Sequence, residues 1–512
     1  MGRAWAPLPG PPLLASVALL LLLLLLLVLR WRRRPAEAAG LRGPWGWPLV
    51  GNALQLGRLP HRTFWAWARR YGEVFRLRLG SRAVVVLNGG AAIREALLRQ
   101  GAPFAGRPDF PSFRLVSGGK SMAFGGYTAR SRAQRKAAQA SLRALSASSD
   151  VLERHVAEEA RELVARLVRA CAEQGGYVDP APLLAVANAN VMCALCFGRR
   201  YGHDDAEFRA LLGRNDRFGQ TVASGSLVDV LPWLQRFPNP VRSVFRDFQA
   251  LNEEMHAFVG AQVAQQRRSF LPGRPPRHLG DALLSRGELS GEEAEGALTD
   301  LFGAGQDTTS AGLAWVLLLL LRHPALRRQL QRDLDRVVGP GRLPAAADRP
   351  ALPRLEAFLC ETLRFTSFVP LTIPHAATSD AALGGRPVPA GTVVFVNQWS
   401  ANHDPRRWEE PHRFDPGRFL DAEQQRLDKD RAARVLLFSL GKRRCVGERV
   451  ARLQLFLFAA ILLHQGRLEP KPGQALSLEA QHGLVLRPRP FLLAVSPRAP
   501  GEEGQAEGEE AS

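Results

Sequence analysis

The chain has 512 residues, 46% of them hydrophobic, and a formal net charge of +20 that is carried mostly by arginine. Such a length can bury a large core in one big domain or in two to three ordinary ones. Five cysteines in a chain this long argue against a disulfide framework, and the absence of an arginine–aromatic nucleic-acid module leaves a membrane or an acidic protein as the expected basic-surface partner.

An apolar stretch near the N-terminus predicts a membrane anchor. Residues 13–29 contain only one polar side chain, Ser16, and a cluster of arginines follows at 30–34. Their length is at the short end for a membrane span, and the positive flank predicts a cytosolic C-terminal side, with residues 1–12 in the lumen. The alternative is a cleaved signal peptide, which the long apolar run and the charge behind it disfavour.

The next segments predict a linker and the start of the globular body. Residues 30–52 are basic and rich in glycine and proline, which stiffens a linker. A helix is expected near residues 61–70. Two alternating apolar runs, 74–79 and 83–87, are separated by a glycine and a serine and predict a β-hairpin.

The pattern from residue 90 to 335 is mostly helical, with breaks near 237–240 and 272–276. Within it, Cys193 and Cys196 form a CxxC in an apolar context, where structural burial is a better interpretation than a metal or redox site. Short strands are expected within 371–396 and 483–495. We expect a catalytic body over 53–498 and a disordered tail over 499–512.

A polar group interrupts the apolar helix expected around residues 297–320. Ala304 is followed by Gly305, Gln306, Asp307 and Thr308. Glycine beside aspartate and threonine is unfavourable in mid-helix, so the segment predicts a kink with a freed backbone carbonyl. The alternative is an ordinary polar helix surface.

Cys445 lies in a segment with several defined positions: Phe438, Gly441, Arg443, Cys445 and Gly447, which read F-x-x-G-x-R-x-C-x-G. Glycines allow a tight turn that brings backbone N–H groups close to the sulfur. A thiolate is a strong anionic axial ligand for haem iron, and an adjacent arginine can pair with a haem propionate. The alternative is a free cysteine in a basic surface loop.

This segment resembles the haem-thiolate loop of the cytochrome P450 family, and the resemblance extends over about residues 40–495. Glu361-x-x-Arg364, which is a weak signal by itself, precedes Phe414–Phe419, which resembles the family's second charged segment. Several stretches are most similar to family 1 and its B subfamily: 117–124, 225–234, 237–241, 367–375 and 394–405.

The resemblance implies a fold, a cofactor and an activity. The fold would be mainly α with small β-sheets (α+β), the cytochrome P450 prism with a buried haem b. The activity would be hydroxylation or epoxidation of lipophilic, planar aromatic, steroid or retinoid substrates with O₂ and electrons from NADPH. Its partners would be NADPH–cytochrome P450 reductase, cytochrome b5 and the endoplasmic reticulum membrane, with mitochondria as a second location and no nucleic acid.

The resemblance also implies roles for individual residues. Thr308 and Asp307 would manage protons, and Cys445 would ligate the iron. The other haem contacts would be Arg107, Arg135, His375, Phe438, Gly441 and Arg443. The substrate pocket would be lined by Phe124, Asn215, Phe218, Asn252, Asp300, Gly303, Ala304, Thr308, Val369 and Leu484. A structural charge triad would consist of Glu361, Arg364 and Arg418.

One departure bears on haem retention. The family has a tryptophan four residues before the arginine that corresponds to Arg135, and here that position is Ser131. Serine cannot reproduce the indole N–H or its packing, so we expect looser haem retention. Two other functions remain open on the sequence: a haem-thiolate isomerase or dehydratase of the hydroperoxide type, and a catalytically weak haem- or ligand-binding protein.

Overall fold

The computed structural model describes residues 40–498 except 148–149, 207, 214–226, 272 and 482, together with residues 15, 16, 19 and 22. Most of the predicted anchor at 13–29 and the whole predicted tail at 499–512 therefore lie outside the described residues. Within the described part, no single helix is both long and apolar enough to cross a membrane.

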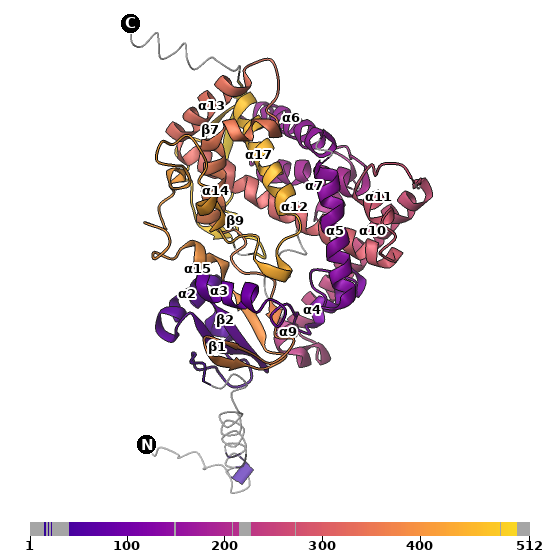
Figure 1. The fold of residues 1–512 in the computed structure, drawn as a ribbon, viewed down its shortest axis with the longest axis vertical. Helices are drawn as coiled ribbons and strands as arrows, with labels where there is room; N and C mark the ends of the chain where they lie inside the picture. Colours follow the sequence, from indigo (N-terminus) through magenta and orange to yellow (C-terminus); the bar gives the residue numbers. More distant parts are fainter. Residues whose placement is uncertain are drawn as a thin grey trace, which may run out of the picture.

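The body is mainly helical with small sheets, as predicted (Figure 1). The helices of its first half are α2 (Pro60–Tyr71), α3 (Gly90–Arg94), α4 (Pro111–Leu115), α5 (Ala129–Ala147), α6 (Asp150–Glu173), α7 (Ala181–Phe197) and α9 (Leu227–Val230). Those of the second half are α10 (Pro240–Ser269), α11 (Leu279–Leu284), α12 (Gly291–Arg322), α13 (Pro324–Val338), α14 (Pro353–Thr366), α15 (Gln398–Asn402), α16 (Lys429–Ala433) and α17 (Glu448–Gln465).

Short 3₁₀ and π turns join these helices. They are η1 (Ala53–Gln55), the π-helical turn η2 (Glu95–Arg99), η3 (Val116–Gly119), η4 (Pro232–Arg236), η5 (Ala346–Ala351), η6 (Pro416–Phe419) and η7 (Gly441–Arg443). The helix expected near 61–70 is α2, and proline at its first position fits because the missing N–H would have had no partner there.

The predicted hairpin is confirmed. Strands β1 (Val74–Leu79) and β2 (Arg82–Leu87) pair antiparallel, and β2 then pairs in parallel with β6 (Val393–Val396), whose other edge holds β3 (His375–Ala376). The remaining strands form three two-stranded sheets: β4 (Ala381–Leu383) with β5 (Arg386–Val388), β7 (Gly466–Pro470) with β10 (Leu493–Pro497), and β8 (Ala480–Gln481) with β9 (Arg487–Pro488).

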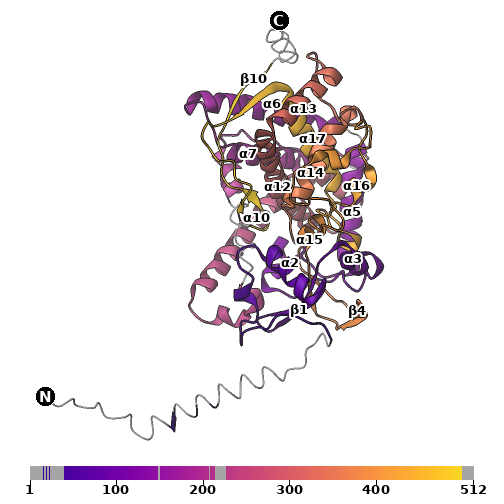
Figure 2. The same cartoon turned by 90° about the vertical axis from the view of Figure 1, so that its left-hand side faces the viewer.

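Helix α12 is the centre of the helical part and lies between α7 on one side and α14 and α17 on the other (Figure 2). Its second half is apolar on every side, and residues 311–321 are all buried. A helix that is hydrophobic all round is stable only when neighbours cover it completely. Helix α7 has the same character, and its Cys193 and Cys196 are buried free thiols, so the burial interpretation of the CxxC is confirmed.

Candidate functional site

A cavity of about 350 Å³ lies in the interior beside the first half of α12. Its walls include the loop around residues 116–124, residues 368–375, the Cys445 loop and residues 484–485, together with Arg107, Gln398 and parts of α5, α7, α10, α11, α12 and α17. These stretches are far apart in the sequence, yet they contain most of the candidate residues. The cavity is therefore the place where the sequence predictions converge.

Cys445 is exposed and lines this cavity just before the N-terminus of α17. The Cys445 N–H donates to the carbonyl of Phe438 at 2.8 Å, which closes the loop. Burial raises the pKa of the Cys445 thiol, while a hydrogen bond from the Gly447 backbone opposes that rise. A helix N-terminus and a nearby N–H both stabilise sulfur in its anionic form.

Gly441 holds the loop close to the π-helical turn η2. Its φ is +66°, and a Cβ at this position would lie 1.9 Å from the Leu97 carbonyl oxygen. Only glycine fits both the left-handed backbone and the close approach. Gly441 does not line the cavity; it allows the Cys445 loop to pack closely against η2.

Helix α15 fixes the beginning of the same loop. The side chain of Asn402 exchanges two hydrogen bonds with the backbone of Leu436, at 2.8 and 2.9 Å. Gln398 accepts from the Ser439 N–H at 2.9 Å and donates to the Leu437 carbonyl at 3.3 Å. Both amides are buried. Sequence reasoning missed these residues because α15 is thirty or more residues away from the loop that it holds.

Four basic side chains gather at one end of the cavity: Arg107, Arg135, His375 and Arg443. Burial, followed by repulsion from neighbouring arginines, lowers the pKa of Arg107 well below its usual value and that of Arg443 to about 10. Burial and then Arg107 lower the pKa of His375. None of the three arginines has an ion-pair partner among the described residues.

Backbone carbonyls hold these cations in place. Arg107 donates to the carbonyls of Ile373 and Pro374, both at 3.0 Å, and Arg443 donates to the carbonyls of Met122 at 2.9 Å and Gly125 at 2.7 Å. Carbonyls are neutral acceptors and leave the clustered positive charge uncompensated. The cluster therefore fits a buried dianion such as the two propionates of a haem.

Ser131 does not contribute to this cluster. It is buried at the start of α5, where its hydroxyl accepts from the Thr128 N–H at 3.0 Å and its own N–H donates to the Thr128 hydroxyl at 3.1 Å. This exchange satisfies free N–H groups at the helix N-terminus. The ring of Tyr127 lies nearby, with its centroid 5.7 Å from the Arg443 guanidinium carbon.

The structure of helix α12 does not bear out the expected kink. It runs without interruption from Gly291 to Arg322, because tertiary contacts support the unfavourable residues. The Asn188 side chain donates to the carbonyl of Gly305 at 3.1 Å and to that of Gln306 at 2.7 Å. The Thr308 hydroxyl donates to the Ala304 carbonyl at 2.7 Å. The carbonyls that we expected to be free are therefore engaged by side chains.

Asp307 and Thr308 both line the cavity. Asp307 also forms an ion pair with Arg487, which belongs to the short strand β9. The ion pair places a cation beside the carboxylate, between α12 and the strand. Nothing in the local sequence around Arg487 indicated this contact.

The predicted substrate-contact residues fall into two groups. Those in the described part of the chain all line the cavity: Phe124, Asn252, Asp300, Gly303, Ala304, Thr308, Val369 and Leu484. Asn215 and Phe218 lie outside the described residues. Asp300 differs from the others because its carboxylate already accepts hydrogen bonds from Ser117, Ser121 and the Ala123 N–H.

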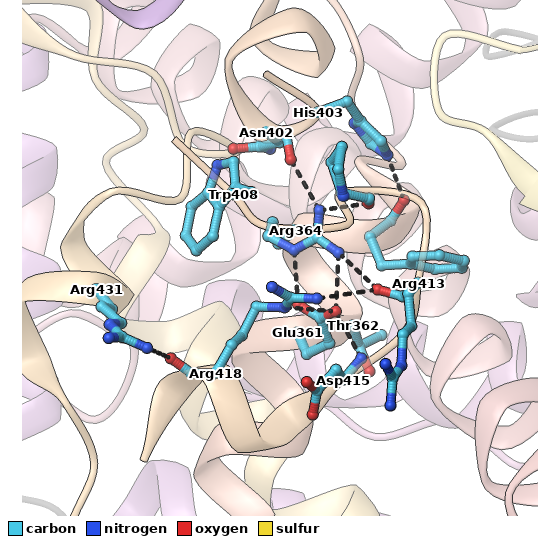
Figure 3. Close-up of polar contacts among 12 residues, drawn as sticks. Glu361, Thr362, Arg364, Asn402, His403, Trp408, Arg413, Asp415, Arg418 and Arg431 are labelled. Carbon is cyan, nitrogen blue, oxygen red and sulfur yellow. Dashed lines mark hydrogen bonds and ion pairs between the residues drawn. The ribbon is translucent and has the colours of Figure 1, made fainter. Parts of the chain in front are cut away.

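Figure 3 shows the charge network of Glu361, Arg364 and Arg418. Arg364 is fully buried, and its guanidinium binds both carboxylate oxygens of Glu361, at 2.6 and 2.8 Å. It also donates to the carbonyl of Asn402 at 2.8 Å. Since Asn402 holds Leu436, the network is linked by one residue to the start of the Cys445 loop.

Comparisons with known proteins agree with this geometry. The family described as Cytochrome P450 matches residues 41–495. The chain is 49% identical to Cytochrome P450 1B1 of Homo sapiens over 487 residues, which are 92% of this chain and 89% of that protein. It is 43% identical to Cytochrome P450 1A1 of Oryctolagus cuniculus over 474 residues, which are 89% of this chain and 90% of that protein.

Proposed function

The chain belongs to the cytochrome P450 family as a family 1 haem-thiolate monooxygenase most similar to the B subfamily, and from this premise we propose its substrates and electron source. The substrates are lipophilic and flat: planar aromatic compounds, steroids or retinoids that become hydroxylated or epoxidised. The electrons come from NADPH through NADPH–cytochrome P450 reductase, with cytochrome b5 as a second donor. The single observation that carries the proposal is that Cys445 lines a cavity together with α12 and the basic cluster.

The residues around the cavity fit a haem. Cys445 would be the axial ligand, and Arg107, Arg135, Arg443 and His375 would hold the propionates. Bound there, a thiolate-ligated haem supplies the activation of O₂ and the transfer of one oxygen atom to the substrate. For a hydroxylation, the substrate C–H becomes C–OH, the second oxygen atom leaves as water, and NADPH is oxidised to NADP⁺ with uptake of one proton.

The protein's own contribution includes proton management. Oγ1 of Thr308 holds its proton towards the Ala304 carbonyl, and the hydroxyl can rotate to pass that proton into the cavity. The adjacent Asp307 carboxylate, ion-paired with Arg487, would take up a proton from bulk water and pass it to the Thr308 hydroxyl. We propose that these two side chains form the proton path.

Substrate shape is the second contribution. The cavity wall includes Phe124 together with the small helix residues Gly303 and Ala304, and with Val369 and Leu484. An aromatic ring and small residues in one cavity wall favour a flat ligand, because the ring can stack on the ligand's face while the small residues leave room for the ligand's thickness. This wall supports the proposal of planar substrates.

The surface around the Cys445 loop supports a basic docking face. Lys442 and Arg444 are exposed on either side of the buried Arg443. Such cations can steer an acidic reductase face towards the haem. We further propose that residues 13–29 anchor the enzyme in the endoplasmic reticulum membrane, with the catalytic body in the cytosol.

Two measurements test the proposed function. The ferrous–CO difference spectrum of the purified chain should show thiolate-ligated haem, and Cys445→Ala should abolish it. NADPH consumption should then yield oxygenated product when reductase is added, with an oestrogen, a retinoid and a polycyclic aromatic hydrocarbon as the panel. Product from a hydroperoxide without NADPH would favour the isomerase or dehydratase, and bound haem with no product from any of the three would favour a binding protein.

A further inference from the structure

The loop that carries Phe124 adopts a strained conformation. We call residues 117–124 the roof loop. Ser117 has φ +54° and Gly118 has φ +58°, so two consecutive residues are left-handed. For a serine this conformation is unfavourable, so other contacts must hold it.

Asp300 of α12 provides those contacts. Its Oδ1 accepts from the Ser117 hydroxyl at 2.7 Å, and its Oδ2 accepts from the Ala123 N–H at 3.0 Å. The Ser121 hydroxyl lies 2.8 and 2.9 Å from the two carboxylate oxygens, so its single proton serves one of them at a time. The Ser121 oxygen in turn accepts from the Phe124 N–H at 2.9 Å.

Two neighbouring contacts keep the roof loop on the same stretch of α12. The Gln134 amide donates to the Lys120 carbonyl at 3.0 Å and to the Glu293 carbonyl at 3.1 Å. At Gly296, a Cβ would lie 2.6 Å from the Lys120 carbonyl oxygen, so the loop backbone contacts the helix backbone there. The loop is therefore attached at both its middle and its end.

The attachment of the roof loop places one of its residues, Phe124, in the cavity wall. Phe124 lines the cavity, and its ring packs edge-on against Phe113, with 5.0 Å between the ring centroids. The Asp300 carboxylate is buried, with 8% of the residue exposed, and it already accepts from two serine hydroxyls and one backbone N–H. Both of its oxygens therefore already have donors from the loop.

We propose that Asp300 is a positioning residue: it fastens the roof loop to α12, and through Phe124 it sets the width of the slot for flat ligands, without hydrogen-bonding the ligand itself. Asp300 was expected in the wall of the substrate pocket, and it does line the cavity; the proposal assigns its carboxylate to the roof loop. The statement about ligands rests on the proposed function, whereas the attachment of the loop does not.

The test uses the full haem-loaded chain and four variants: Ser117→Ala, Asp300→Asn, the double variant, and Ser141→Ala as the control. Ser117→Ala removes one hydroxyl that bonds only Asp300 in the described structure. Asp300→Asn replaces one accepting oxygen with an amide nitrogen. Ser141 is also buried and bonded through its hydroxyl, at 3.2 Å to the Ala282 carbonyl, but it does not line the cavity.

The first measurement is amide hydrogen exchange in residues 117–124 without ligand. The second is the Kd of pyrene, a flat hydrocarbon with no polar atom, measured by the haem spin-state shift. Loss of one hydrogen bond worth about 1 kcal/mol corresponds to about a fivefold change, so Ser117→Ala and Asp300→Asn should each speed exchange and weaken pyrene by about that factor. The double variant should exchange no faster, and bind pyrene no more weakly, than the more strongly affected of the two single variants. The reason is that both changes break the same attachment.

Ser141→Ala should leave both measurements at the parent values. The proposal is overturned if Ser117→Ala leaves exchange and pyrene affinity unchanged while Asp300→Asn weakens only a hydroxylated ligand such as oestradiol, since Asp300 would then contact the ligand. Faster exchange with unchanged pyrene affinity would also overturn the role in ligand selection. If the parent does not bind pyrene, the planar-ligand function fails, and the exchange rates alone decide whether Asp300 attaches the loop.

Discussion

Replacing Arg364 with methionine should lower the melting temperature by about 4 °C. The guanidinium is fully buried, binds both oxygens of Glu361, and donates to the carbonyls of Asn402 and Pro411, each at 2.8 Å. Without it, the buried Glu361 carboxylate keeps an arginine contact only from Arg418, at 3.2 Å. Methionine fills most of the volume but offers no donor.

The magnitude follows from the cost of leaving a buried carboxylate short of partners. Breaking one side of a buried ion pair destabilises a protein by about 3–5 kcal/mol. Unfolding entropy of about 2.1 cal/mol/K per residue gives about 1 kcal/mol/K for a body of roughly 450 residues. A loss of about 4 kcal/mol therefore corresponds to a shift of about 4 °C.

The assay is thermal unfolding of the full haem-loaded chain in detergent, with the parent and every variant heated at the same scan rate. Arg413→Met is the matched control: its ion pair with Glu410 is exposed, and an exposed pair contributes little, so no measurable shift is expected. The double variant Glu361→Leu/Arg364→Met should recover part of the loss, because no buried carboxylate then lacks a partner. A melting temperature for Arg364→Met within about 1 °C of the parent would refute the reasoning.

Three further predictions concern the haem loop, haem retention and pH. Gly441→Ala should abolish haem incorporation, because its Cβ would lie 1.9 Å from the Leu97 carbonyl oxygen, whereas Gly473→Ala, with a similar φ but no close atom, should keep full haem content per protein. Ser131→Trp should slow the transfer of haem to apomyoglobin, and a rate equal to or above that of the parent would contradict the expected weakness there. Burial and Arg364 lower the pKa of His403 to about 3. When the pKa of a base is lower in the folded than in the unfolded protein, the free energy of unfolding falls as pH drops below the unfolded pKa. The parent should therefore lose up to about 2 kcal/mol of its free energy of unfolding from this residue between pH 6.5 and 5. His403→Phe should show a correspondingly shallower fall in melting temperature over the same pH range. Equal pH slopes would count against that assignment.

The sequence determined the features whose signals are local. The alternation in 74–79 and 83–87 predicted the hairpin of β1 and β2, because side chains of a strand point to alternate faces. The spacing of Phe438, Gly441, Arg443 and Cys445 within a few residues predicted the loop that presents the sulfur, because one turn of backbone brings them together. The Glu361–Arg364 ion pair followed from two positions on one helix face.

Where tertiary contacts compete with local preference, the sequence was misleading. The glycine, aspartate and threonine after Ala304 predicted a kink, yet α12 continues through them. Helix propensities of a few tenths to about 1 kcal/mol per residue are easily offset by packing and hydrogen bonds. Here the offsetting partner is Asn188 on α7, more than a hundred residues earlier in the chain.

Only the tertiary structure decided which side chains meet across the cavity. The ion pair of Asp307 with Arg487 and the attachment of Ser117 to Asp300 join residues separated by 180 and 183 positions. Sequence spacing fixes distances only within one element, and contacts between elements depend on how the whole chain packs. The sequence thus indicated the loop around Cys445, whereas the folded packing around α12 determined that the Asp300 carboxylate accepts hydrogen bonds from Ser117 and Ala123.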